Sequence, residues 1–202
     1  MKELIVATRN KKKLQEIRVL LADMDLAITS LADYPDLPQI EEDGKTFTQN
    51  AIKKAASIAM ATKKLTMGED SGLEVKALGN APGVYSARFS GANANDKKNN
   101  AKLLRSLKDV PLKKRQARYR CHVALADAHG LIDVVSASCS GLIASKSKGK
   151  NGFGYDPLFI IPRFQKTFGE LDPVIKARIS HRSRALKKFK KVIQKYFEGY
   201  RG

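Results

Sequence analysis

The segment that most constrains the fold lies in the second half of the chain, where side-chain character alternates with a period of two. Across residues 117–125, apolar positions alternate with two arginines and a histidine. Such a pattern places one set of side chains on a buried face of an extended strand and the other set on the opposite face. The segment "DAHG", residues 127–130, predicts a turn, and residues 131–143 return as a second strand. The sequence therefore predicts a long antiparallel hairpin.

The first half of the chain alternates strands with helices instead. Residues 4–8, "LIVAT", are typical of a buried strand, and a basic helix is expected from about Lys11. A second strand is predicted over residues 26–31, and a second helix begins near Thr46, with Gln49 at capping-box spacing. Alternating elements followed by a hairpin predict an α/β fold with a mixed sheet and flanking helices.

The segment "ATRNKKK", residues 7–13, joins the first strand to the first helix. Backbone N–H groups at a helix N-terminus attract anions, and lysines add positive charge. Thr8 and Asn10 supply further donors at the same turn. The alternative is an ordinary helix cap by Asn10 with solvated lysines, and this segment taken alone favours the cap.

Two adjacent acids, Glu69 and Asp70, follow an apolar segment and are flanked by glycines. We expect separate short strands over residues 65–68 and 72–75, with the acids where the first strand ends. A carboxylate at that point can hold a metal ion and orient a water molecule, and Ser71 can meet a phosphate. The alternative is an Asx or Ser turn, but the glycines on both sides favour a site.

A second acidic segment, residues 41–43, precedes Gly44 and the capped helix. Mg²⁺ is typically held by one or two carboxylates together with substrate phosphates. A solvated acidic loop explains the same residues, and taken alone this segment favours that alternative.

Two later segments carry aromatic and basic side chains. "NGFGYDP" places Phe153 and Tyr155 among glycines, where they can stack on a flat base or fold into the core. "KARISHRSRAL" brings Lys176, His181 and Arg182 to an expected helix start. Cations there oppose the helix dipole, which suggests a bound anion or carbonyl. The alternative is that one of them points to solvent and another pairs with an acid.

Composition narrows the classes of function. Of 202 residues, 43% are hydrophobic, so a folded core is expected, and the net charge of +18 favours polyanions without choosing among them. A GxxxxGK[ST] phosphate loop does not occur, and Cys121 and Cys139 have no CxxC partner, so both are interpreted as reduced thiols. Without an apolar run near ~20 residues or a signal-peptide pattern, we expect a cytoplasmic protein with no membrane partner.

Five segments occur together in one order: "ATRNKKK", "EEDGKTFTQNAIKKA", "EDSGLEVKALGNAPGVYSARFSG", "GFGYDPLF" and "ISHRSRAL". In this order and spacing the chain resembles the inosine-triphosphate pyrophosphatases, also called dITP/XTP pyrophosphatases. The resemblance runs from Leu4 to about Leu186, nearly the whole chain. Each segment alone is weakly specific, whereas five in register are very specific.

The resemblance implies an elongated α/β fold over residues 1–202, a single domain with two lobes around a central nucleotide cleft. It implies Mg²⁺-dependent hydrolysis of ITP, dITP and XTP to the monophosphate and pyrophosphate, which removes these purine nucleotides from the pool. A homodimer is expected, and no specific nucleic-acid partner.

The resemblance also assigns roles position by position. Asp70 is expected to activate the attacking water and, with Glu41, to bind Mg²⁺. The residues expected to contact the phosphates are Thr8, Arg9, Asn10, Lys11, Lys12, Lys13, Lys54 and Ser71. Those expected to hold the base and sugar are Phe153, Gly154, Tyr155, Asp156, Lys176, His181 and Arg182.

Arg182 has the sharpest of these expected roles. A guanidinium only donates hydrogen bonds, so it can pair with the 6-oxo group of hypoxanthine or xanthine but not with the 6-amino group of adenine. Two alternatives remain from sequence alone: a related pyrophosphatase acting on pyrimidine nucleotides, and a basic nucleic-acid-binding module. A substrate panel separates the first, and salt-sensitive nucleic-acid binding without turnover would indicate the second.

Overall fold

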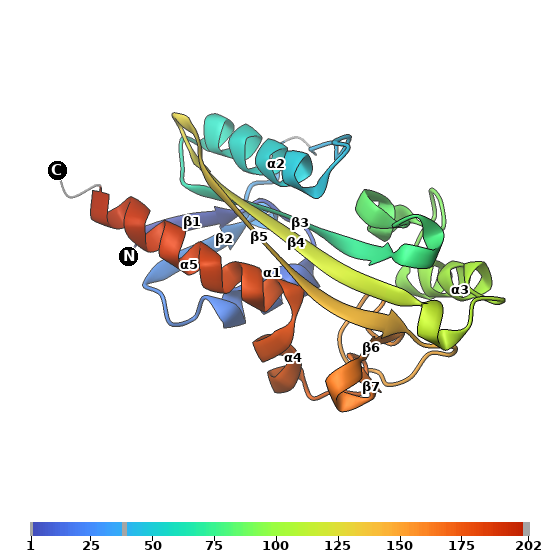
Figure 1. Ribbon diagram of the computed structural model, residues 1–202. Helices are drawn as coiled ribbons and strands as arrows, with labels where there is room; N and C mark the ends of the chain where they lie inside the picture. The colour runs from blue at the N-terminus through green and yellow to red at the C-terminus, as the bar shows by residue number, and fades with distance from the viewer. Residues whose placement is uncertain (1, 38–39, 200–202) are drawn as a thin grey trace. The chain divides into compact units, whose positions relative to one another are not determined.

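The computed structural model describes residues 2–37 and 40–199 (Figure 1). The described part of the chain contains one seven-stranded sheet, in which the strands lie in the order β2-β1-β3-β4-β5-β6-β7. The strands are β1 (Lys2–Val6), β2 (Leu26–Ser30), β3 (Thr66–Val75), β4 (Gln116–Asp127), β5 (Gly130–Ile143), β6 (Phe159–Ile161) and β7 (Lys166–Thr167).

The directions of the strands make this sheet mixed. β1 pairs in parallel with both β2 and β3, whereas β5, β6 and β7 pair antiparallel. β4 and β5 are neighbours joined by a two-residue turn, a connection that only antiparallel strands allow. The predicted α/β class, mixed sheet and late hairpin are confirmed.

The helices are α1 (Lys11–Leu20), α2 (Phe47–Thr62), α3 (Asp96–Ser106), α4 (Pro173–Ile179) and α5 (His181–Gly199). The capping box of Thr46 and Gln49 at the start of α2 is present as predicted. Asn95 caps α3, since it has the extended backbone of a cap and its side chain accepts from the Lys98 N–H, and Asp96 is the first residue of the helix.

The prediction of two short strands around the acidic pair was wrong. β3 runs without interruption from Thr66 to Val75, so Glu69 and Asp70 lie in the middle of a ten-residue strand rather than at its end. Glycine-flanked acids usually mark a turn, but here the glycine at position 68 serves packing. Side chains alternate along a strand, and the two neighbouring carboxylates therefore point to opposite faces.

The chain divides into two compact units. Unit 1 comprises Met1–Asp70, Cys121–Ala137 and Arg182–Gly202, and unit 2 comprises Ser71–Arg120 and Ser138–His181. β3, β4 and β5 each contribute residues to both.

Unit 1 has hydrophobic clusters on both faces of its sheet, one on the first face and two on the second. On one face, Leu4, Val6, Met67 and Cys121 pack with residues of α1 and α5. On the other face, the alternate positions of the same strands pack against α2 in two clusters, Ala51, Ala55, Ala59, Ala124 and Ala126 in one and Ile5, Ala7, Leu31 and Ile58 in the other.

The contact between α2 and β3 is unusually close at Gly68. A Cβ atom added there would overlap the carbonyl oxygen of Ala51 and lie 2.6 Å from the backbone nitrogen of Ala55. The backbone of the helix therefore rests directly on the backbone of the strand, two residues before Asp70.

Unit 2 has a core of its own, built around Tyr119, Phe159 and Phe168, whose ring centroids lie 4.6–6.3 Å apart. The buried Arg115 guanidinium donates to three backbone carbonyls in this unit, those of Leu107, Val110 and Ala144. Among the described residues of the whole chain, no helix is both long and apolar enough to cross a membrane.

Candidate active site

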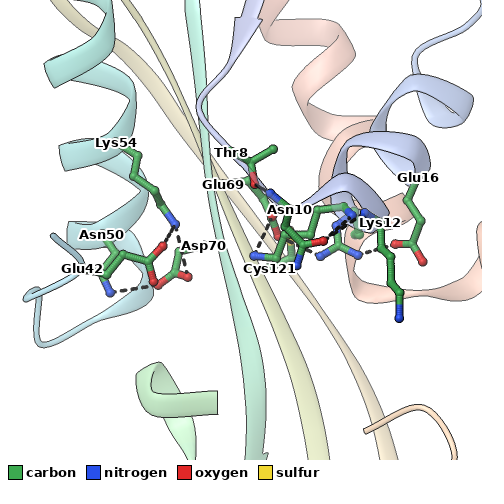
Figure 2. A network of polar contacts seen from close by, with 12 residues as sticks. Thr8, Asn10, Lys12, Glu16, Glu42, Asn50, Lys54, Glu69, Asp70 and Cys121 are labelled. Atoms are coloured by element: carbon green, nitrogen blue, oxygen red, sulfur yellow. Dashed lines mark hydrogen bonds and ion pairs between the residues drawn. The ribbon is translucent and has the colours of Figure 1, made fainter. Parts of the chain in front are cut away.

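Asp70 lies at the centre of a polar cluster on the α2 face of unit 1 (Figure 2). Its Oδ2 accepts a hydrogen bond of 3.0 Å from Asn50 Nδ2, and its Oδ1 lies 3.5 Å from Lys54 Nζ. Lys54 Nζ also donates to Glu42 Oε1 at 2.7 Å. One ammonium group thus stands between two carboxylates, on a helix whose position is fixed by its close approach to β3.

The surroundings of Asp70 disfavour its charged form. Burial is the largest influence and raises the pKa of the carboxyl above its usual value, although the Lys54 and Lys13 cations and the Asn50 hydrogen bond act in the opposite direction. A carboxylate with a raised pKa is a stronger base than an ordinary one, which suits the role of a general base.

The acidic loop before α2 is tied to the same helix. Asn50 Oδ1 accepts from the Gly44 N–H at 2.8 Å, and Lys53 pairs with Asp43 at 2.7 Å. Glu42 is the acid of this loop that shares Lys54 with Asp70, whereas Glu41 is exposed. Glu41 as a metal ligand stays a prediction, and of the acidic segment 41–43 the family resemblance gave a role to Glu41 but not to Glu42.

The turn between β1 and α1 is an N-cap of the ordinary kind. Asn10 Oδ1 accepts from the backbone N–H groups of Lys12 and Lys13 at 3.0 and 3.1 Å, and Thr8 Oγ1 accepts from the Asn10 N–H at 3.1 Å. Arg9 donates to backbone carbonyls of residues 31 and 37. The cap that the sequence offered as an alternative is therefore present, and it engages the backbone N–H groups of Lys12 and Lys13.

Glu69 points to the other face of the strand and meets α1 and α5. Its Oε2 lies 3.2 Å from Lys13 Nζ, and its Oε1 lies 3.2 Å from Arg182 Nη2 and accepts from the Cys121 thiol at 3.4 Å. Arg182 Nη1 pairs with Glu16. Arg182 is thus one of the expected cations paired with an acid, the alternative that the sequence left open.

This second cluster is almost sealed from solvent, because the side chains of Glu69 and Arg182 are only 1% and 2% exposed. Burial opposes charge on Lys13 and Arg182, but the acids outweigh it: Glu69 above all raises the pKa of Lys13, and Glu69 and Glu16 raise that of Arg182. Burial, followed by Glu69, raises the pKa of the Cys121 thiol, which keeps it protonated. Both cysteines are free thiols, as predicted.

Unit 2 brings together the expected residues for the base from its loop and from α4. Asp156 Oδ2 accepts from Lys176 Nζ at 2.7 Å and from the Phe153 N–H at 2.8 Å. The Lys176 ammonium also lies 4.9 Å from the centre of the Phe153 ring. Lys176 is in the last turn of α4, so the expectation that it opens a helix was wrong.

Two further residues of this set are built into the core of unit 2. His181 stacks on Tyr119 with ring centroids 4.5 Å apart. Tyr155 is buried and donates its hydroxyl to the Ser86 carbonyl at 2.8 Å, and burial raises its pKa. Tyr155 is therefore a core residue, the alternative that the sequence left open for the loop aromatics.

Gly154 is held on both sides by α3. Its N–H donates to Asp96 Oδ2 at 2.9 Å and its carbonyl accepts from Asn100 Nδ2 at 2.9 Å. The loop that carries Phe153 and Asp156 is thereby fixed to a helix more than fifty residues earlier in the chain.

The comparison with protein families decides the relationship of this chain. The model of the Ham1 family matches residues 4–192. This chain belongs to the Ham1 family.

Curated proteins and solved structures agree with this assignment. A dITP/XTP pyrophosphatase of Desulforamulus reducens is 47% identical over 195 residues, 96% of this chain and 97% of that protein. One of Geobacter sulfurreducens is 48% identical over 92% of this chain and 94% of that protein. The structure of a HAM1 protein from Coxiella burnetii has a TM-score of 0.88 at 38% identity, covering 96% of this chain and all of that one. The Staphylococcus aureus Ham1 protein gives 0.84 at 36% identity, covering 99% of this chain and all of that one.

In this member of the Ham1 family, sequence reasoning missed four side chains that organise the two clusters of unit 1. They are Glu16, Glu42, Asn50 and Glu69. Only Glu42 and Glu69 had a sequence signal, since each stands beside an acid that was assigned a role.

Proposed function

We propose that this chain hydrolyses non-standard purine nucleoside triphosphates, ITP, dITP and XTP, to the monophosphate and pyrophosphate. The observation that carries the proposal is the buried Asp70 carboxylate beside the Lys54 ammonium. It occurs in a chain that matches proteins named dITP/XTP pyrophosphatase over nearly its whole length. The name of those relatives supports the substrate class, and the cluster supplies groups suited to the chemistry.

In this mechanism a water oxygen attacks the α-phosphorus. The bond between the α-phosphorus and the oxygen that bridges it to the β-phosphorus breaks, and pyrophosphate leaves. Asp70 accepts the proton of the water at its carboxylate, which its raised pKa favours. Asn50 fixes the orientation of that carboxylate through its hydrogen bond. Lys54 and Lys13 supply positive charge to the phosphate oxygens and to the pyrophosphate that leaves.

The residues of the Asp70 cluster fit a magnesium ion. Asp70 with Glu42 or Glu41 would offer carboxylate oxygens, and the Lys54 ammonium between Asp70 and Glu42 marks a place where positive charge is already stabilised. In the described part of the chain, no group of three or more acidic, histidine or cysteine side chains could hold a metal. Few protein ligands are usual for Mg²⁺, which relies on water and substrate phosphates. Bound Mg²⁺ would neutralise charge on the phosphate oxygens.

We propose that the residues of unit 2 hold the base. Phe153 offers a face for stacking, with its backbone held by Asp156, and Lys176 is fixed by the same carboxylate. Recognition of the 6-oxo group by Arg182 stays a prediction, and its pairing with Glu69 and Glu16 means that it would have to donate to the base while it keeps these partners.

A substrate panel tests the proposal. The protein is incubated with ITP, XTP, ATP, GTP, dTTP and UTP in Mg²⁺, and pyrophosphate and orthophosphate are measured separately. We expect pyrophosphate from ITP and XTP and a much lower kcat/KM for ATP. Adenine carries a hydrogen-bond donor at position 6, where hypoxanthine and xanthine carry an acceptor. Release of orthophosphate, preference for pyrimidines, or equal use of ATP would each contradict the proposal.

We also propose a cytoplasmic homodimer, for which the family resemblance is the support. Light scattering on the purified protein measures the mass directly, and a monomer at micromolar concentration would contradict the dimer.

A further inference from the structure

Glu69 is a buried acid for which the mechanism above has no use. It contacts Lys13, a proposed phosphate ligand, and Arg182, a proposed base ligand, with different oxygens of one carboxylate. The third contact is the Cys121 thiol, which donates to the oxygen that also meets Arg182. All four side chains belong to unit 1, and Figure 2 shows Glu69 and Cys121 next to the turn that carries Thr8 and Asn10.

We propose that Glu69 is a positioning residue, which acts by holding the Lys13 ammonium where the triphosphate is bound. This inference rests on the proposed function and goes beyond it by giving a task to a residue that touches no substrate.

The need for such a residue follows from the lysine itself. Lys13 stands in the first turn of α1, on a flexible four-carbon side chain that loses much rotamer freedom when it is fixed. The Asn10 cap engages the backbone N–H groups of this turn, so Lys13 contributes through its side chain alone. A lysine that is already held loses less entropy when an anion binds, which favours affinity.

Glu69 is suited to hold it because it is itself immobile. It sits on the central strand β3, its side chain is 1% exposed, and Arg182 and Cys121 fix its second oxygen. The Lys13 side chain is 18% exposed, so it is less enclosed than the carboxylate that holds it. Glu69 thus holds the ammonium of a lysine whose side chain is only partly enclosed, as a prepositioned anion ligand requires.

The alternative is that Glu69 only neutralises buried cations, and the two roles predict opposite changes in affinity. If neutralisation is the whole role, Glu69→Gln removes one negative charge near the phosphates. The local net charge then becomes more positive, and binding of the anion becomes tighter. If Glu69 positions Lys13, the same variant releases the lysine and binding becomes weaker, despite the added charge. The sign of the change therefore separates the two.

The experiment measures KM and kcat for ITP, and by calorimetry the affinity for inorganic tripolyphosphate, in four proteins: wild type, Glu69→Gln, Lys13→Met and the double variant. We expect Glu69→Gln to weaken tripolyphosphate and raise KM by about ten- to a hundredfold, with a smaller change in kcat. In the Lys13→Met background the same substitution should change either quantity less than threefold, because the residue it positions is gone.

Glu16→Gln is the matched control. It removes one negative charge from the same network and from the same arginine, but Glu69 is the acid that pairs with Lys13, whereas Glu16 pairs with Arg182. We expect this variant to bind tripolyphosphate as tightly as wild type or more tightly. Glu69→Asp, which keeps the charge but shortens the reach, serves if Glu69→Gln does not fold, and should weaken binding less than tenfold.

Tighter binding by Glu69→Gln, or an equal effect with and without Lys13, would overturn the positioning role. If the wild type releases no pyrophosphate from any purine triphosphate, the proposed function fails. The tripolyphosphate affinities still decide the role of Glu69 in that case, so the two failures are distinguishable.

Discussion

Glu69 and Asp70 are neighbours on one strand, yet their carboxylates belong to two different kinds of site. Glu69 is enclosed with cations and a thiol, and its side chain is 1% exposed. Asp70 shares a single ammonium with Glu42, a residue that is 34% exposed at its side chain. The first environment surrounds its carboxylate with the Lys13 and Arg182 cations, whereas burial in the second raises the pKa of the Asp70 carboxyl.

The difference teaches that sequence adjacency says little about role in a strand. A period of two sends consecutive side chains to opposite faces, so Glu69 meets the face covered by α1 and α5 and Asp70 meets the face covered by α2. One acid organises cations and the other is proposed to take a proton. The following predictions test whether the two acids differ in this way.

The largest effect is expected for Asp70→Asn, which keeps the shape but removes the proposed base. Loss of a general base typically lowers the rate by about 10²–10⁴-fold, and loss of a magnesium ligand would add to this. We expect kcat for ITP to fall by at least that amount while the fold is retained. A variant within a few-fold of wild type would remove Asp70 from the chemistry.

The free energy of unfolding should fall more in Glu69→Gln than in Asp70→Asn, the opposite order to their expected effects on the rate. Glu69→Gln leaves Lys13 and Arg182 buried with one acid fewer, and breaking a buried ion pair costs about 3–5 kcal/mol of unfolding free energy. Asp70→Asn should cost little, since burial already disfavours its charge. Urea denaturation of both variants measures this, and equal losses would mean that the two acids are not as different as their surroundings suggest.

The third prediction concerns the contact that places α2. Gly68→Ala puts a Cβ against the backbone of Ala51 and Ala55, so the helix must shift. Overpacking of this kind costs about 1–3 kcal/mol, and the displacement of Lys54 and Asn50 should lower kcat as well. Gly199→Ala, whose added Cβ meets nothing within 4 Å, is the control. A fully active and stable Gly68→Ala protein would show that the close approach is not needed.

The smallest effect is a pH dependence of stability in metal-free protein. The pKa of Asp70 is raised above the unfolded value of 3.8 by burial. Its contribution to stability is therefore greatest below that pH and is lost as the pH rises through the folded pKa. The unfolding free energy of Asp70→Asn relative to wild type should increase from acid to neutral pH. A difference that stays flat would mean that the pKa is ordinary.

Local rules predicted the helix starts well. Asn10 and Thr46 cap their helices as expected, because a cap depends on a few residues next to one another. The same rules failed at β3, since Gly68 is required by a helix that packs from outside its own segment and not by a turn.

The two clusters could be predicted only in part for a related reason. Asp70 was indicated by the acidic pair itself and Lys54 by the family resemblance, but the pairing of Glu69 with Arg182 joins residues 113 positions apart. Nothing in the order of the residues specifies that pair. Only the packing of α5 on the sheet brings it together.

The close approach at Gly68 also bears on any attempt to transplant this site. At Gly68 little side chain is present to absorb a change, because the helix presents Ala51 and Ala55 to a glycine. The distance between Lys54 and Asp70 is thus set by the direct contact between the backbones of α2 and β3. A designer who copied the polar side chains onto another scaffold would reproduce the parts of the cluster but not the spacing, unless that glycine and the alanines above it were copied as well.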